Sequence, residues 1–332
     1  MPRFDLMQVH NLVNWPDHLR TMRRDRDAGL VRYIGITTSR EAQYEEFEKV
    51  MRNETLDFIQ INYSLGEREA EDRDHLDNRE RGPHARLLPA REFADAELAP
   101  YVAEWDEAAV LPVDAVHKMG DLGLFALPFP EETGGMGGDF TSLCVAIEEI
   151  GRVDQSLGIT LEAGVGLGIN PIFTYGTERQ RDELLPDLMA GRALAGFGLT
   201  EAEAGSDAGA TRTKAELDGD EWVINGEKWF ASHARFSEFL LVMVVTNTER
   251  PIHEGASIIL VEKDTPGFDA PEIHRKFSLR ASVTSSLFFD NVRVPAENML
   301  PEVKGLKGPL SCLTQARYGI AWGVVGAAMA KG

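Results

Sequence analysis

The segment from residue 197 to residue 210 contains the side chains that point most directly to a chemical role. It reads FGLTEAEAGSDAGA, so a glycine, a hydroxyl and a carboxylate follow one another at Gly205, Ser206 and Asp207. A loop of small residues lets backbone N–H groups approach a phosphate closely, and the Ser206 hydroxyl adds a donor. The same tripeptide is also typical of surface turns, so phosphate binding depends on what surrounds the loop.

Other residue types that carry catalysis do not cluster in the sequence. The eight histidines are scattered, and no HExxH or Cys/His spacing predicts a metal site. Cys144 and Cys312 lie in apolar surroundings without a CxxC partner, which predicts buried thiols in a reducing compartment. The run GVGLG at residues 164–168 resembles half of a dinucleotide fingerprint, but no strand precedes it and its surroundings are helical. We therefore do not expect it to bind a nucleotide.

The composition indicates a globular, strongly acidic protein. Asp and Glu outnumber Lys and Arg by 54 to 34, which gives a formal net charge of -20. That charge repels phosphate backbones and excludes a broad nucleic-acid surface. It favours solubility, and a salt-adapted source is one interpretation. The N-terminus has no apolar signal region and no apolar run is long enough to span a bilayer, so we expect a cytoplasmic location without a membrane span.

The first part of the chain alternates strands with helices. Residues 5–10, 31–37 and 56–65 predict strands, and residues 16–30 and 41–51 predict amphipathic helices. That rhythm is typical of parallel βαβ units. Residues 66–87 are dense in charge and contain Gly82-Pro83, which indicates a solvated linker and a domain boundary.

The remainder begins helical and then changes period. Residues 90–195 repeat apolar side chains at helical spacing, whereas residues 193–298 alternate with period two. Asp218-Gly219 and Asn225-Gly226 both favour hairpin turns, so we expect an antiparallel β-domain. Residues 313–330 predict a helix that is apolar nearly all round and must be buried among other helices. None follows in the sequence, so we expect the chain to end inside a helical domain.

The loop and its neighbours resemble the acyl-CoA dehydrogenase family. Residues 198–207 match a family signature: small, aliphatic, Ser or Thr, Glu, two free positions, small, Gly, Ser, Asp. The resemblance continues in register through the Gly-rich loop at 130–138, YGTERQ at 175–180, NGEKWFAS at 225–232 and residues 280–295, and covers about Leu87 to Ala330. It implies a multi-domain α+β fold: a helical domain at 87–195, an antiparallel β-domain at 196–300 and the first part of a C-terminal helical bundle at 301–332.

The resemblance also implies an FAD site and an acyl-CoA site. Phe197, Leu199 and Thr200 would line the pyrimidine edge of the flavin, and Gly205 and Ser206 would bind its pyrophosphate. The strand segment Phe230, Ala231 and Ser232 would lie beside the ring, with the Ser232 hydroxyl where the family usually has Thr. Ser206 and Arg317 would contact the acyl-CoA, while Thr314 replaces an Asp that some relatives carry. The plainer alternative makes Phe230 and Leu199 core residues and Arg317 a surface charge.

The implied reaction is the α,β-dehydrogenation of an acyl-CoA thioester, with an electron-transfer flavoprotein as acceptor. It requires a Glu base whose pKa is raised by a desolvated pocket. In the family that Glu lies in the C-terminal helical domain, and no acidic residue follows Glu302 here. We therefore assign no catalytic residue and expect this chain to be inactive, with the family's homo-oligomer compromised. The alternatives are a non-catalytic fusion of two truncated enzymes, an interaction module, or a residual NADPH-dependent aldo-keto reductase module.

Residues 5–73 resemble the middle of an aldo-keto reductase, through DLMQVHN, GLVRYIGIT and LDFIQINYSL. The resemblance implies a βαβαβ fragment of a TIM barrel over residues 1–73, followed by a charged linker at 74–86. His10 matches that family's active-site His, and Asn62 lies in a segment similar to its nicotinamide contact. The Tyr, Lys and Asp that complete such a site are not in this sequence segment, so we expect no NADPH-dependent reductase activity.

Overall fold

Two compact units make up the chain. The computed structural model describes residues 4–38, 40–56, 58–61 and 88–330. The units are Met1–Ala85 and Arg86–Gly332, and each is described by itself. The predicted charged linker and Asn62 lie outside the described residues.

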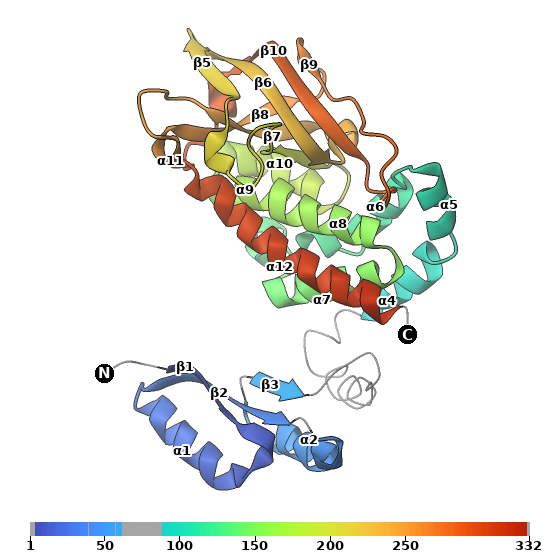
Figure 1. Ribbon diagram of the computed structural model, residues 1–332, viewed down its shortest axis with the longest axis vertical. Helices are drawn as coiled ribbons and strands as arrows, with labels where there is room; N and C mark the ends of the chain where they lie inside the picture. The colour runs from blue at the N-terminus through green and yellow to red at the C-terminus, as the bar shows by residue number, and fades with distance from the viewer. Residues whose placement is uncertain (1–3, 39, 57, 62–87, 331–332) are drawn as a thin grey trace. The chain divides into compact units, whose positions relative to one another are not determined.

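The first unit is a small parallel sheet with helices (Figure 1, blue). Its elements are β1 (Phe4–Val9), the 3-10 turn η1 (His10–Leu12), α1 (Trp15–Asp27), β2 (Val31–Thr38), the 3-10 turn η2 (Glu41–Gln43), α2 (Tyr44–Asn53) and β3 (Phe58–Ile61). The strands pair in parallel in the order β1-β2-β3, which confirms the predicted βαβαβ pattern. Leu19, Ile34 and Phe47 are among the buried residues of its core. The described strands form an open parallel sheet. No other feature of the described residues supports the predicted fragment of a TIM barrel.

The second unit begins with a helical layer. Its elements are α4 (Leu88–Phe93), the π-turn η4 (Ala94–Leu98), α5 (Val102–Ala108), α6 (Val113–Asp121), the 3-10 turns η5 (Leu124–Ala126) and η6 (Glu131–Thr133), α7 (Phe140–Val153), α8 (Gln155–Ala163), the π-turn η7 (Gly164–Ile169), α9 (Asn170–Tyr175) and α10 (Glu178–Met189). Asp139 and Asp154 start α7 and α8 as N-caps, because each carboxylate accepts a backbone N–H, from Ser142 and Ser156 respectively. The predicted helical character of residues 90–195 is confirmed.

The elements α8, η7 and α9 form one continuous helix through residues 155–175. It is long and apolar enough to cross a membrane by length and composition, so the prediction that no such run exists is wrong. However, 72% of its most apolar window is buried inside the fold, as in the core helix of a globular domain. The GVGLG run lies in the π-turn of this helix, which agrees with the prediction that it is not a nucleotide loop.

A seven-stranded sheet follows the helical layer. Its strands are β4 (Ala195–Gly198), β5 (Lys214–Asp218), β6 (Glu221–Ser232), β7 (Phe239–Val245), β8 (Ala256–Glu262), β9 (Phe268–Asp269) and β10 (Thr284–Pro295). The order is β4-β7-β5-β6-β10-β9, with β8 paired to β7. Most pairs are antiparallel, but β4 runs parallel to β7, so the expected purely antiparallel domain is wrong. The chain enters β4 directly from the helical layer, and a crossover of some forty residues separates it from β7, which permits parallel pairing.

One of the two predicted hairpin turns does not form. Asp218-Gly219 turns the chain between β5 and β6 as expected, but Asn225-Gly226 lies inside the long strand β6. Asn225 pairs with Lys214 of β5, and Gly226 pairs with Phe289 of β10. A Cβ at Gly226 would lie 2.6 Å from the Thr213 hydroxyl oxygen. Gly226 is therefore required because another backbone segment approaches β6 closely here, and not because the chain turns.

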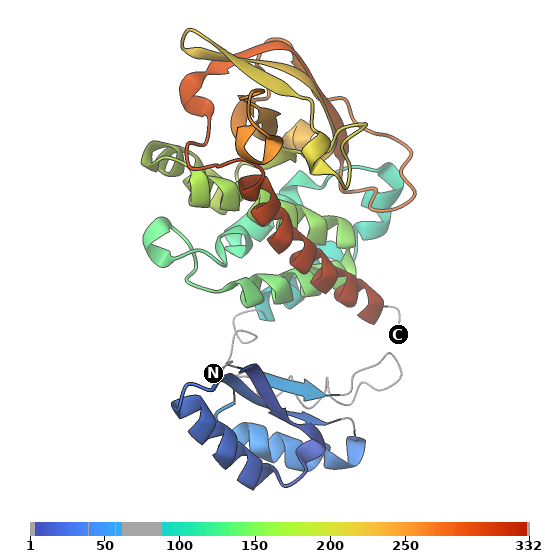
Figure 2. The same ribbon diagram turned by 60° about the vertical axis from the view of Figure 1, so that its left-hand side comes forward.

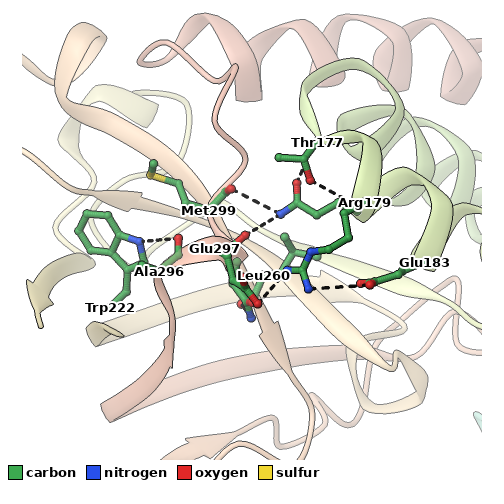
Figure 3. A network of polar contacts seen from close by, with 10 residues as sticks. Thr177, Arg179, Glu183, Trp222, Leu260, Ala296, Glu297 and Met299 are labelled. Atoms are coloured by element: carbon green, nitrogen blue, oxygen red, sulfur yellow. Dashed lines mark hydrogen bonds and ion pairs between the residues drawn. The ribbon is translucent and has the colours of Figure 1, made fainter. Parts of the chain in front are cut away.

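The two layers are joined at the start of α10 (Figure 3). Thr177 and Gln180 form a reciprocal capping box there. The Gln180 amide also donates to the Glu297 carbonyl at 2.9 Å, and Arg179 pairs with the Glu297 carboxylate at 2.8 Å. Glu297 belongs to the 3-10 turn η10 (Ala296–Asn298) that follows β10. The Trp222 indole of β6 donates to the Ala296 carbonyl at 3.3 Å, so the same turn connects the sheet and the helix.

The last helix, α12 (Lys307–Met329), packs on α7 and α8 through small residues (Figures 1 and 2). Its glycines at 319, 323 and 326 are buried, whereas Tyr318 and Val324 are more than half exposed. A Cβ at Gly326 would lie 2.1 Å from the Glu148 carbonyl oxygen of α7. The expected helix is confirmed, but it is buried along its glycine face rather than all round.

We predict that Gly326→Ala destabilises the protein by about 1–3 kcal/mol, because the added methyl overpacks a backbone contact. The gain in helix propensity, about 1 kcal/mol, opposes this effect and is smaller. Urea unfolding followed by circular dichroism measures the change. Val325→Ala, at a position that is 45% exposed, is the control and is expected to change stability by no more than about 0.5 kcal/mol. A Gly326→Ala variant as stable as the parent would contradict the close packing of α12 against α7.

Candidate functional site

The chain leaves the sheet at the end of β4 and enters the loop with the phosphate-binding pattern. Phe197 is buried in β4, and Leu199 and Thr200 are half-buried just after it. Glu201 and Ala204 exchange backbone hydrogen bonds of 3.0 and 3.1 Å, which closes a tight turn. Gly205 and Ser206 are exposed, and nothing lies within 4 Å of the position of a Cβ on Gly205. The loop is therefore anchored at its base and open at its tip.

A buried ion pair holds the base of this loop. The Lys228 ammonium of β6 lies 2.7 Å from the Glu201 carboxylate, with the side chains 0% and 7% exposed. The Glu201 carboxylate also accepts the backbone N–H groups of Arg212 and Thr213 at 2.7 and 3.0 Å. Lys228 donates further to the Leu199 carbonyl at 3.1 Å. Both ends of the loop, at Leu199 and at Thr213, are thus joined to one strand.

Burial and mutual attraction act in opposite directions on this pair. Burial lowers the pKa of Lys228 to about 8, although the hydrogen bond and the charge of Glu201 oppose the shift. Burial raises the pKa of Glu201, but Lys228 and the N–H groups of the loop outweigh it and hold that pKa below its usual value. Both groups are therefore charged near neutral pH, and neither could be neutralised without leaving the other unpaired.

The end of β6 supplies the second part of the site. The Trp229 N–H donates to the Thr200 carbonyl at 2.7 Å, which places residues 228–232 beside residues 199–200. Phe230 has a left-handed backbone with φ of 62° and a side chain that is 63% exposed. Ala231 is buried and Ser232 is half-buried, and both pair with β10 at Ser285 and Thr284. An exposed aromatic ring thus lies next to the loop, at a strained backbone position.

Three hydroxyl groups of this region are available to a ligand. Those of Thr200, Ser206 and Ser232 make no hydrogen bond to another of the residues that the structure describes. Together with the open loop and the exposed Phe230 ring, they could bind a planar ring and a phosphate group. The structure thus places the predicted residues Phe197, Leu199 and Thr200 at the end of β4 beside Phe230, Ala231 and Ser232 at the end of β6, and Gly205 and Ser206 in the exposed loop that follows β4.

The remaining predicted residues lie elsewhere. Arg317 and Thr314 are exposed on α12, where the Thr314 hydroxyl donates to the Leu310 carbonyl at 3.1 Å. In the first unit, the His10 ring contacts the Thr37 hydroxyl and the Asn11 amide, each at 3.0 Å. A cavity of about 460 Å³ opens beside His10 between β1 and α1 and also includes His18 and Asp25. Cys144 and Cys312 are buried as predicted, and burial raises their pKa values to about 12 and about 11.

Sequence reasoning missed three buried ionisable side chains, those of Glu201, Lys228 and Glu162. The Glu201–Lys228 pair joins residues 27 positions apart, and only the apolar residues around Lys228 hint at its burial. Glu162 of α8 is 4% exposed and has no hydrogen bond or ion pair to another described residue. Its side chain lies between α8 and α12, in room left by Gly166 and Gly319. Burial raises the pKa of Glu162 to about 8, so this carboxyl is largely neutral at pH 7.

We predict that Lys228→Met destabilises the protein by about 3–5 kcal/mol, because Glu201 remains buried and charged without its partner. The double variant Glu201→Gln, Lys228→Met should lose less, since it buries no charge. Lys263→Met is the control, because that lysine forms an exposed pair with Glu238 and its substitution should leave stability nearly unchanged. Urea unfolding of the parent, Lys228→Met, the double variant and Lys263→Met measures these losses, and a double variant less stable than Lys228→Met would contradict the prediction.

We predict that Glu162 makes the folded protein less stable as the pH rises. Because folding raises the pKa of Glu162 from 4.5 to about 8, its contribution to stability is complete below pH 4.5 and is lost as the pH rises to 8. Glu162→Gln stays neutral, so between pH 5 and pH 8 it should lose about 3 kcal/mol less stability than the parent. Urea unfolding at both pH values tests this, with exposed Glu178→Gln as control. Equal losses in parent and Glu162→Gln would show that Glu162 is not buried in solution.

Comparisons with known proteins identify the second unit. Residues 87–192 match the model for the acyl-CoA dehydrogenase N-terminal domain, and residues 196–292 match that for the middle domain. The protein named "Probable acyl-CoA dehydrogenase YngJ" from Bacillus subtilis is 42% identical over 241 residues, which cover 72% of this chain. The chain spans 63% of the length of that relative.

Two solved structures are similar in fold as well as in sequence. A glutaryl-CoA dehydrogenase from Mycobacterium smegmatis, in complex with FADH2, is 38% identical with a TM-score of 0.74; the match covers 81% of this chain and 67% of that one. A chain in a structure described as the electron transferring flavoprotein of Acidaminococcus fermentans is 37% identical with a TM-score of 0.72, over 75% and 65%. The open loop at the end of β4, the exposed ring of Phe230 and these matches together establish that the chain belongs to the acyl-CoA dehydrogenase family.

Proposed function

We propose that the protein binds FAD at residues 197–206 and 230–232 and takes part in the α,β-dehydrogenation of acyl-CoA thioesters. The observation that carries the proposal is the loop after β4, which the Glu201–Lys228 pair anchors beside the exposed Phe230 ring. The family match supports the cofactor, since a structure with FADH2 is among the similar proteins. The cofactor is FAD.

The residues fit a flavin dinucleotide in three respects. Gly205 leaves open space at the loop tip, where a phosphate can approach the backbone. The free hydroxyls of Thr200, Ser206 and Ser232 supply neutral donors, and the nearby charge of Glu201 is compensated by Lys228. Phe230 offers an aromatic face that the protein does not cover. The donor set is thus largely uncharged, as suits a ring with several acceptor atoms.

Each residue has a distinct part in the proposed chemistry. When bound, the flavin would supply an acceptor for the β-hydrogen that leaves the acyl group as a hydride. Ser232 and Thr200 donate hydrogen bonds to the ring, Phe230 packs beside it and excludes water, and Ser206 binds the pyrophosphate. Ser206 and Arg317 are our proposed contacts to the acyl-CoA. Helix α12 contains no Asp or Glu, so the base that abstracts the α-proton is not a residue of that helix.

Four further proposals concern the electron acceptor, the assembly, the location and the first unit. The electron acceptor is an electron-transferring flavoprotein, because a similar chain comes from a structure of such a protein. The active form is a homo-oligomer, and the location is cytoplasmic. For the first unit, the parallel order β1-β2-β3 and the His10–Thr37 contact support an aldo-keto reductase-like fragment without activity of its own.

Flavin absorbance tests the proposal directly. After incubation with excess FAD and removal of the unbound cofactor, the protein should retain flavin with shifted absorption bands. Ser232→Ala should weaken FAD binding about threefold to tenfold, because one hydrogen bond contributes about 0.5–1.5 kcal/mol. Ser232→Thr keeps the hydroxyl and should retain the affinity of the parent.

The control is Thr248→Ala, which removes an exposed hydroxyl from the turn after β7 and should leave FAD binding unchanged. A folded protein that stays colourless at high FAD concentration would refute the proposed function. Equal affinities of Ser232→Ala and the parent would refute the role of Ser232 alone.

A further inference from the structure

His233, the residue that follows Ser232, is completely enclosed by the protein. It is 1% exposed, and its backbone is left-handed with φ of 42°. The chain reverses at this residue, between the end of β6 and the 3-10 turn η9 (Ala234–Phe236). Left-handed backbone is uncommon for residues other than glycine, although His, Asn and Asp tolerate it better than most. The surroundings must therefore hold His233 in place.

Four hydrogen bonds do so: one to the segment before β10, one to β4, and two within the local turn, where the His233 carbonyl also accepts the Phe236 backbone N–H at 2.9 Å. The His233 N–H donates to the Val283 carbonyl at 2.6 Å, directly before β10. The His233 carbonyl accepts the Ser237 hydroxyl at 3.1 Å. The Nε2 atom of the ring lies 3.2 Å from the Ala195 carbonyl of β4, and since a carbonyl can only accept, Nε2 carries the proton. The ring thus connects Ser232 at the end of β6 with β4, two residues before Phe197.

The other ring nitrogen has no partner. Nδ1 is buried and makes no hydrogen bond to any of the residues that the structure describes. The charged groups nearest in sequence or packing are engaged elsewhere: Arg235 with Glu272, Glu238 with Lys263, and Lys276 with the carbonyls of Leu279 and Ser282. A proton on Nδ1 would therefore be a buried charge with an unsatisfied N–H. Burial accordingly lowers the pKa of His233 to about 4.

We propose that His233 is a positioning residue of the flavin site, which holds the Ser232 hydroxyl and the β4 edge in register and does so only as the neutral imidazole. This inference rests on the proposed function, because Ser232 and Phe197 are its two ends. The ring contributes no atom to the ligand. Instead, it fixes the distance between the two strands that the flavin contacts. Acid therefore favours the unfolded chain, in which His233 can take up a proton.

The expected pH effect follows from the direction of the shift. A histidine whose folded pKa lies below the unfolded value of 6.5 contributes stability that is complete above pH 6.5 and is lost as the pH falls towards 4. Between pH 7.5 and pH 5 this raises the equilibrium constant for unfolding about thirtyfold. Glu162 shifts the same constant in the other direction, but equally in every His233 variant.

Two substitutions separate the hydrogen bond from the backbone strain. His233→Gln places an amide N–H near the position of Nε2 and cannot be protonated. His233→Asn tolerates the left-handed backbone equally well or better, but its shorter side chain does not reach the Ala195 carbonyl. His253→Gln, at an exposed histidine of the same domain, is the control and should behave as the parent.

The experiment loads the full chain with FAD at pH 7.5 and measures the flavin spectrum and midpoint potential, then urea unfolding at pH 7.5 and 5. His233→Asn should bind FAD with a changed spectrum and potential, and His233→Gln should restore both. Acidification from pH 7.5 to pH 5 should raise the equilibrium constant for unfolding about thirtyfold more in the parent than in His233→Gln. A His233→Asn flavin identical to that of the parent, or equal acid losses in the parent and His233→Gln, would overturn the inference. If the parent binds no FAD at all, the proposed function fails, while the unfolding comparison still decides whether His233 works as a neutral link.

Discussion

The buried pair between Glu201 and Lys228 is the interaction on which the site depends. Taking two charges out of water costs several kcal/mol each, so such a pair is tolerated only when further hydrogen bonds satisfy it. Here the carboxylate accepts two backbone N–H groups besides Lys228, and the ammonium also donates to the Leu199 carbonyl. Gly198 leaves room for the lysine stem, since a Cβ there would lie 3.2 Å from Lys228 Cγ. The path of residues 199–213 follows from these contacts.

The uninterrupted run of β6 is what makes this pair possible. A turn at Asn225-Gly226 would have separated Lys228 and Ser232 from the strand that pairs with β5. Because β6 continues to Ser232, Lys228 and Ser232 lie on the same strand that pairs with β5 over residues 221–225, and both pair with β10. The same strand thus holds the base of the loop and presents Phe230 and Ser232 beside it. A rigid strand is a more precise support for such side chains than a loop would be.

Local patterns were sufficient to predict most elements from the sequence, and non-local contacts explain the failures. Helical spacing, period-two alternation and the Asp218-Gly219 turn depend on neighbouring residues and were predicted correctly. The parallel pairing of β4 with β7, the continuity of β6 at Gly226 and the Glu201–Lys228 pair depend on residues brought together by folding. The structure brings the predicted site residues of β4 and β6 together, but the motif alone could not show what holds the loop or that His233 links the strands.

Two buried groups give this fold opposite responses to acid. Glu162 favours the folded state in its protonated form, whereas His233 favours it in its neutral form. Between about pH 4.5 and 6.5 the two contributions therefore change in opposite directions and largely cancel in the stability of the whole chain. A flat pH profile in that range would not show that neither group titrates on unfolding. The groups lie in different layers, Glu162 beneath α12 and His233 beside β4, so substitution of one leaves the contribution of the other intact.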